Sequence, residues 1–203
     1  WFAADAGRAL LLAGKRDESL AWYDLVAGGH DPEAKTAEMS LRPLLLLENA
    51  QEGAGDDALL DEWLGASAPQ AAAQGTVVAA AATVGETAPA PARVVDDETA
   101  ALVLGLLDEL GVHVPPRQWE PYVSAERRTA AMPLVPLWQE LRAAARDRRI
   151  GETVLLALIA LGDGDLKETE PIVIDAAVGA LAATGLRDEA RALAIEAAVA
   201  HGL

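Results

Sequence analysis

The 203-residue sequence contains no cysteine and only one phenylalanine, and aromatic residues make up 4% of it. Without cysteine the chain has no disulfide framework and no thiolate chemistry. Apolar residues nevertheless account for 52% of the sequence, mainly as alanine, leucine and valine. Because small side chains let helix axes approach and alanine has the highest helix propensity, this composition favours closely packed helices.

Positive charge is scarce as well. Sixteen Lys and Arg face 32 Asp and Glu, which gives a formal net charge of −16. No basic residue lies between Arg42 and Arg93. Nucleic-acid binding requires a basic face, so we expect no nucleic-acid partner. The same charge disfavours adhesion to anionic lipid.

Long hydrophobic runs are missing too. The longest, Thr153–Leu161 and Ile172–Thr184, fall short of the roughly 20 residues of a membrane span, so we predict no transmembrane segment and expect both to be buried core helices. The sequence opens on Trp1 already in a helical pattern, which indicates a piece of a longer or processed protein. We expect a soluble chain, in the cytoplasm or the periplasm; the sequence does not decide between them.

No segment alternates between apolar and polar residues over the length of a strand, and helical spacing recurs along most of the chain. The predicted fold class is therefore all-α, with helical hairpins packed as an irregular α-solenoid or bundle. Helices are expected over residues 1–14, 17–27, 32–47, 56–64, 97–110, 119–123, 126–132, 134–145, 152–161, 172–184 and 188–201.

Several residues mark where these helices begin or end. Asp17, Asp31 and either Asp96 or Asp97 are predicted N-caps, because a side-chain carboxylate accepts hydrogen bonds from the free N–H groups of the first turn. Pro43 is expected to kink or break the third helix, since its ring clashes with the preceding turn.

Residues 67–95 differ in composition from the rest of the chain. They are dominated by small residues and proline and contain almost no large side chains, so burial offsets little of the entropy of ordering. We predict an N-terminal helical-hairpin block over 1–66, an Ala/Pro-rich linker or long loop over 67–95, and a C-terminal helical block over 96–203.

A helical-hairpin signature occurs near both ends of the chain. AGKRDESLAWY at Ala13–Tyr23 is echoed by TGLRDEARALA at Thr184–Ala194. In each copy a glycine, Gly14 or Gly185, is followed two residues later by Arg-Asp-Glu and then by small and apolar residues at helical spacing. This pattern indicates one helix ending and the next packing back against it.

The spacing of Gly7, Gly14, Ser19, Tyr23 and Pro32 resembles a tetratricopeptide-type repeat. Such a repeat has small residues where its two helices cross, an aromatic residue late in the second helix and a closing proline. The second copy keeps Gly185, Ala190 and Ala197 in register. The resemblance implies a helical-hairpin solenoid with a concave or edge surface for docking a protein or peptide.

No catalytic motif is present. The three histidines, His30, His113 and His201, lie about 85 residues apart, whereas a helical zinc site places them close in sequence or space. Asp163-Gly-Asp165 is similar to part of a calcium loop but lacks the remaining ligand order. We therefore expect no catalytic residue, no cofactor and no metal site.

One basic cluster stands out: Arg142, Arg146, Arg148 and Arg149. The simpler interpretation is a helix C-terminus decorated with cations that complement its dipole. The alternative is a docking site for an acidic partner, or for the chain's own acidic residues between Glu48 and Glu62. Nucleic acid is disfavoured because no aromatic residues are interleaved with the arginines.

A second candidate partner-binding region is the proline-flanked aromatic pair Trp119 and Tyr122, in the sequence PPRQWEPY. Tryptophans in a helical protein mostly pack in the core. Trp119 is the one of the five that we expect to be exposed, and with Tyr122 it forms a possible peptide-binding site.

The function predicted from these features is a non-catalytic protein-interaction or assembly module built of helical hairpins, with an unidentified protein partner. Two alternatives stay open. One is a structural subunit of a cell-envelope or multiprotein complex, which the Ala/Pro-rich segment fits equally well. The other is a helical enzyme with a site not visible in the sequence, which requires a pocket with converging polar groups.

Overall fold

The computed structural model describes residues 2–29, 31–50, 60–64, 95–123 and 134–203, and every regular element in these ranges is a helix. The all-α prediction is therefore confirmed. The helices are α1 (Phe2–Leu12), α2 (Arg16–Ala27), α3 (Pro32–Asn49), α5 (Asp97–Glu109), α6 (Pro116–Val123), α7 (Val135–Arg146), α8 (Ile150–Leu161), the short 3-10 helix η3 (Leu166–Glu168), α9 (Pro171–Thr184) and α10 (Arg187–Ala200). Residues 60–64 are also helical.

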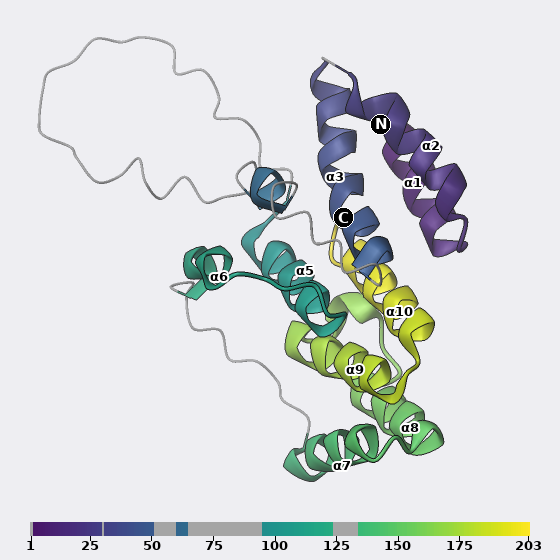
Figure 1. Cartoon of the computed structure of the whole chain (residues 1–203), viewed down its shortest axis with the longest axis vertical. Coiled ribbons are helices and arrows are strands. Elements are labelled where there is room, and N and C mark those ends of the chain that lie inside the picture. Colours follow the sequence, from purple (N-terminus) through teal and green to yellow (C-terminus); the bar gives the residue numbers. More distant parts are fainter. Residues whose placement is uncertain (1, 30, 51–59, 65–94, 124–133) are drawn as a thin grey trace, which may run out of the picture.

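The helices form an irregular stack in which each helix packs against its neighbours (Figure 1). At one end α1, α2 and α3 pack together, and α10 lies against α1 and α3. From α10 the stack continues through α9, which contacts α10, α5 and α8, and it ends at α7. None of the helices in the described ranges has the length and hydropathy needed to cross a membrane.

One hydrophobic core joins helices from both halves of the sequence. It includes Leu44 and Leu47 of α3, Leu104 of α5, Ile174 of α9 and Ile195 of α10, all almost completely buried. Helices of the predicted blocks 1–66 and 96–203 therefore pack directly against each other. The division into domains stays a prediction, because residues 67–94 of the expected linker, like the helix expected at 126–132, lie outside the described residues.

Two of the predicted N-caps are confirmed and one is wrong. Asp31 Oδ1 accepts from the Ala34 N–H and Asp96 Oδ1 from the Thr99 N–H, each at 2.8 Å. Helix α2, however, begins at Arg16, with Lys15 at the cap and no side-chain hydrogen bond there. Asp17 lies one step inside the first turn, where its charge still complements the N-terminal end of the helix dipole.

Pro43 was expected to kink or break its helix. It does not break it, because α3 continues through Pro43 to Asn49. A proline inside a helix leaves the carbonyl four residues earlier without its partner. Here that carbonyl belongs to Met39, and it accepts a hydrogen bond from the indole Nε1–H of Trp63 at 3.2 Å. Trp63 is fully buried, so a side chain distant in sequence replaces the bond that Pro43 cannot make.

The two glycines of the repeated signature lie at the helix ends, as predicted. Gly14 separates α1 from α2 and Gly185 separates α9 from α10, both with positive φ angles, 69° and 96°. In the first hairpin Ser19 Oγ donates to the buried Gly7 carbonyl at 3.0 Å. A Cβ atom on Gly7 would lie 2.7 Å from Leu41 Cδ2, so α3 approaches α1 closely because position 7 has no side chain.

Candidate functional site

The two aromatic residues proposed as a peptide-binding pair lie on α6. Trp119 and Tyr122 are both partly buried, and both pack against the main hydrophobic core. The expectation that Trp119 is exposed is therefore wrong. Its ring contributes to fixing α6 on the core, because a proline-flanked helix of eight residues has little intrinsic stability of its own.

The four arginines of the basic cluster divide between two places. Arg142 and Arg146 are one turn apart on α7 and line the same groove, and Arg146 Nε donates to the Arg142 carbonyl at 3.3 Å. Arg148 and Arg149 lie in the turn between α7 and α8. Arg149 forms ion pairs with Asp147 and Glu152, whereas Arg148 has no ion pair with any of the described residues.

The described acidic residues between Glu48 and Glu62 are not the partners of this cluster. Glu48 pairs with Arg191 at 3.4 Å, Asp61 with Arg117 at 3.0 Å and Glu62 with Arg42 at 2.8 Å. The hypothesis of an internal dock is therefore wrong for Glu48, Asp61 and Glu62. Residues 51–59, which contain the other acids of that region, lie outside the described residues.

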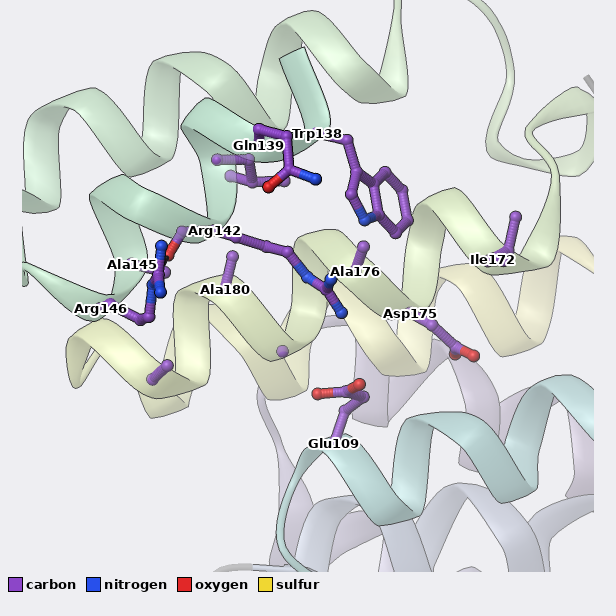
Figure 2. A pocket seen from close by; sticks show the side chains of 13 residues that line it. Glu109, Trp138, Gln139, Arg142, Ala145, Arg146, Ile172, Asp175, Ala176 and Ala180 are labelled. Atoms are coloured by element: carbon purple, nitrogen blue, oxygen red, sulfur yellow. Dashed lines mark hydrogen bonds between the residues drawn. The ribbon is translucent and has the colours of Figure 1, made fainter. Parts of the chain in front are cut away.

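A groove of about 600 Å³ lies between α7 and α9 and reaches the end of α5 (Figure 2). We call it the α7–α9 groove. Trp138 and Arg142 reach into it from α7, while α9 contributes a surface of small residues. Figure 2 shows the Arg142 side chain extending along α9 toward two carboxyl groups, those of Asp175 and Glu109. The lining residues are Glu109, Trp138, Gln139, Leu141, Arg142, Ala145, Arg146, Ile172, Asp175, Ala176, Gly179, Ala180 and Ala183.

The two carboxyl groups of the groove occupy spaces left by two glycines. A Cβ atom on Gly105 of α5 would lie 2.3 Å from Asp175 Oδ2, and one on Gly179 of α9 would lie 2.0 Å from Glu109 Oε2. In each helix the glycine and the acid are four residues apart, so they share a face. Each helix therefore places its carboxyl group over the glycine of the other.

Burial changes the protonation of this pair. The pKa of Asp175 rises from 3.8 to about 7, first because the carboxyl is withdrawn from water and then because Glu109 and Asp108 are nearby. The pKa of Glu109 is also raised by partial burial and by Asp108, and Arg142 opposes that rise. Asp175 Oδ1 is buried without a hydrogen-bond partner among the described residues. A buried carboxyl without hydrogen bonds favours its neutral form.

The charged and titratable groups in the described lining of the groove are the carboxyl groups of Asp175 and Glu109 and the guanidinium groups of Arg142 and Arg146. That part of the lining contains no histidine, serine, threonine or lysine that would act as a nucleophile or relay a proton from Asp175. Across the described parts of the chain, no group of three His, Asp or Glu is placed to hold a metal ion. Asp165, from the Asp163-Gly-Asp165 fragment, accepts from the Lys167 N–H and caps η3.

The helix over 150–161 differs most from its prediction as a buried core helix. Only Thr153 and Ala157 of α8 are buried, whereas Leu155, Leu158 and Ile159 are 58%, 60% and 56% exposed. These three residues lie with Gly151 and Gly162 on the outer side of the helix. We call this surface the α8 face. The inner side packs on α7 and α9.

Sequence reasoning missed the α8 face, although one signal was available. A helix that is apolar nearly all round is buried only if other elements cover every side. Helix α8 instead lies near one end of the stack, next to α7 and α9 (Figure 1). Ile150, at the start of α8, is exposed as well. The raised pKa of Asp175 had no sequence signal, because it depends on where α5 crosses α9.

The two ends of the α8 face differ in charge. Arg146 and Arg148 precede the helix, and neither forms an ion pair with a described residue. Asp163 and Asp165 follow it and are likewise without an ion pair among the described residues. Between Glu152 and Asp163 the sequence carries no charge. The α8 face is thus an uncharged strip with cations at one end and anions at the other.

Comparison with known proteins found no match to any family model, curated protein or solved structure.

Proposed function

We propose that this chain is a non-catalytic helical module that assembles with a protein partner through the α8 face. The observation on which the proposal rests is the exposure of Leu155, Leu158 and Ile159 on one side of α8. Single exposed apolar residues are common on protein surfaces, but several adjacent ones on one helix are typical of an interaction site.

The surroundings of the α8 face support the same proposal. An apolar strip bordered by charged groups has the layout of an interface, with a hydrophobic centre and a polar rim. Arg148 and Asp165 lie at opposite ends of that rim. Rim charges guide association and orient the partner more than they add affinity.

The α7–α9 groove supports a catalytic alternative less well. A buried acid with a raised pKa in a groove is a candidate catalytic group in general. Here the position of Asp175 already has a packing explanation, since its carboxyl group fills the space over Gly105. Catalysis also needs a second group that acts on the substrate, and the described lining of the groove offers Glu109, Gln139 and two arginines but no nucleophile.

The proposed function is tested by capture from the native cell extract on the immobilised full chain, with quantification by mass spectrometry. The test variant is Leu155→Glu combined with Leu158→Glu, which places two charges on the α8 face without disturbing a buried residue. The matched control is Leu25→Glu, because Leu25 is 70% exposed and belongs to α2, a helix that lies far from α8 in the stack (Figure 1).

We expect the wild type and Leu25→Glu to retain the same partner, whether another protein or a second copy of the chain, and the α8 variant to lose it. Circular dichroism of all three proteins verifies that they are equally folded. Equal capture by all three proteins, together with an unchanged state of self-association, would contradict the proposed function.

A further inference from the structure

We propose that the α8 face binds the α8 face of a second copy of this chain, with the two helices antiparallel about a two-fold axis between Leu156 and Ala157. The proposal rests on the proposed function and names its partner. It follows from the symmetry of the exposed residues, from the charges at the helix ends and from the uncharged strip between them.

The exposed residues of α8 have the same spacing in both directions. Gly151, Leu155, Leu158 and Gly162 are separated by four, three and four positions. A helix turns by about 100° per residue, so Gly151, Leu155 and Leu158 lie within a narrow sector on one side, and Gly162 follows as the C-cap of the helix. In an antiparallel pair centred between Leu156 and Ala157, Leu155 of one copy lies opposite Leu158 of the other, and Gly151 lies opposite Gly162.

This self-matching is the property that a two-fold interface requires. In such an interface the same patch serves both subunits, and residue i contacts residue j while j contacts i. The two leucine pairs fill the centre, and the glycines at both ends leave room for the helix backbones to approach. Ile159 lies beside the leucines and extends the apolar contact.

The charges at the helix ends select the antiparallel orientation and a second copy as partner. Arg148 lies in the turn before α8, and Asp163 and Asp165 lie in the turn after it. In an antiparallel pair the turn before one helix lies beside the turn after the other, which brings Arg148, without an ion pair among the described residues, to Asp163 and Asp165 of the second copy. A parallel pair would instead place like charges together, which costs free energy. Arg149 is not part of the proposed contact between copies, because it already forms ion pairs with Asp147 and Glu152.

The size of the surface sets the expected strength. A 12-residue helix is about 18 Å long, so the strip is smaller than the roughly 800 Å² per partner of a standard stable interface. We therefore expect a weak dimer, with a dissociation constant in the micromolar range, that weakens further as salt screens the Arg148–Asp165 contacts.

Sedimentation velocity of the full-length chain over a range of concentrations tests for this dimer. We expect a reversible monomer–dimer equilibrium for the wild type and for Leu25→Glu. Leu155→Glu and Leu158→Glu should each raise the dissociation constant at least about tenfold, since each places two carboxylates in the apolar centre. A wild type that stays monomeric up to the highest soluble concentration overturns the proposal, whatever else covers the α8 face.

A charge exchange tests the orientation of the two helices. Arg148→Glu alone creates two contacts between acids in its own dimer, and Asp165→Arg alone creates two contacts between cations. Both single variants should therefore be weaker dimers than the wild type. Mixed together they should form a heterodimer, because every contact then joins opposite charges, and the chain with both substitutions should dimerise by itself. Failure of the mixture to associate better than its components overturns the antiparallel register.

Failure of this proposal is distinguishable from failure of the proposed function. If the chain is monomeric, but it captures another protein that Leu155→Glu with Leu158→Glu no longer captures, the partner is that protein and not a second copy. The dimer proposal then fails and the proposed function stands. If the chain dimerises and the same double variant dimerises equally well, the dimer does not use α8 and the proposal is overturned. If the chain is monomeric and capture is unchanged, both proposals fail.

Discussion

The carboxyl group of Asp175 lies directly over Gly105, so that a Cβ atom at position 105 would be 2.3 Å from its Oδ2 atom and 2.8 Å from its Cγ atom. Helix α9 approaches α5 this closely because Gly105 has no side chain. The reverse contact, Glu109 over Gly179, lies one turn further along both helices. These two contacts pack α9 closely against α5. They also bury the carboxyl group of Asp175, which lines the α7–α9 groove.

Replacing Gly105 by Ala should lower the free energy of unfolding by about 1–3 kcal/mol, the usual cost of overpacking. Gly179→Ala should cost less, because the long side chain of Glu109 can rotate away whereas the short one of Asp175 cannot. Chemical unfolding followed by circular dichroism measures both. Gly28→Ala is the control, since a Cβ atom there meets nothing within 4 Å and its φ angle of −93° suits any residue.

A double variant tests whether the contact with Asp175 causes the loss of stability in Gly105→Ala. If it does, Gly105→Ala should lower the free energy of unfolding much less in a chain that also contains Asp175→Ala. The difference between the two costs is the interaction energy of a double-mutant cycle. Additive costs would show that the methyl group collides with something other than Asp175.

Stability should fall as the pH rises from about 4 to about 7. The pKa of Asp175 is raised to about 7 in the folded chain and lies near 3.8 in the unfolded chain, so the folded state holds the extra proton between these values. Raising the pH through this window removes the proton from a buried group, with an upper limit of the order of 4 kcal/mol. Urea unfolding at a series of pH values measures the slope.

Asp175→Asn is the matched variant for this slope, because an amide has similar shape and no titration in the window. We expect its stability to change less with pH and to exceed that of the wild type above about pH 7. Glu109 contributes a smaller slope of the same sign in both proteins, since its pKa is raised too. Parallel slopes for the two proteins would contradict the raised pKa of Asp175.

Trp63→Phe should destabilise the chain by leaving the Met39 carbonyl, which Pro43 deprives of its helical partner, without the indole hydrogen bond. A buried unsatisfied carbonyl costs about 1–3 kcal/mol. Restoring the missing N–H with Pro43→Ala should recover part of this loss in the double variant. The comparison is made by thermal unfolding, and no recovery would show that Trp63 acts through packing alone.

Arg42→Met should be among the most damaging substitutions. Arg42 is buried and contacts Glu38 at 2.5 Å, Glu62 at 2.8 Å and the Tyr23 hydroxyl at 3.3 Å. Without it Lys35, at 3.8 Å, is the one cation paired with the buried Glu38 among the described residues. Breaking a buried pair by removing one partner costs about 3–5 kcal/mol. Chemical unfolding should show a loss of this order.

Adding Glu38→Leu to Arg42→Met should restore much of that stability, because both members of the buried pair are then apolar. Arg117→Ala, which breaks the exposed pair with Asp61, is the control and should change the unfolding transition very little. An equal loss in the control would mean that burial is not what makes Arg42 important.

The sequence predicted the features that depend on neighbouring residues. The caps at Asp31 and Asp96 and the glycines at positions 14 and 185 act within one or two turns, so their spacing was enough to locate them. That α3 continues through Pro43 could not be predicted from neighbouring residues, because the compensating donor, Trp63, is 20 residues away. A local pattern contains no information on which distant side chain satisfies a freed carbonyl.

The candidate site was less predictable for a similar reason. Arg142, Arg146, Arg148 and Arg149 form one cluster in the sequence. In the structure the first two lie on α7 and line the α7–α9 groove, whereas the last two lie in the turn between α7 and α8. The exposure of α8 depends on its place in the stack. Its apolar composition shows only that it has more than one hydrophobic side.

The packing of α10 against α1 and α3 has a consequence for how the protein is made. Helices α1 to α3 are synthesised before α10, which supplies part of their cover, and Arg191 of α10 is the residue that binds the side chain and carbonyl of Glu48. Apolar residues such as Leu44 and Leu47 therefore lack part of their cover until α10 has been synthesised.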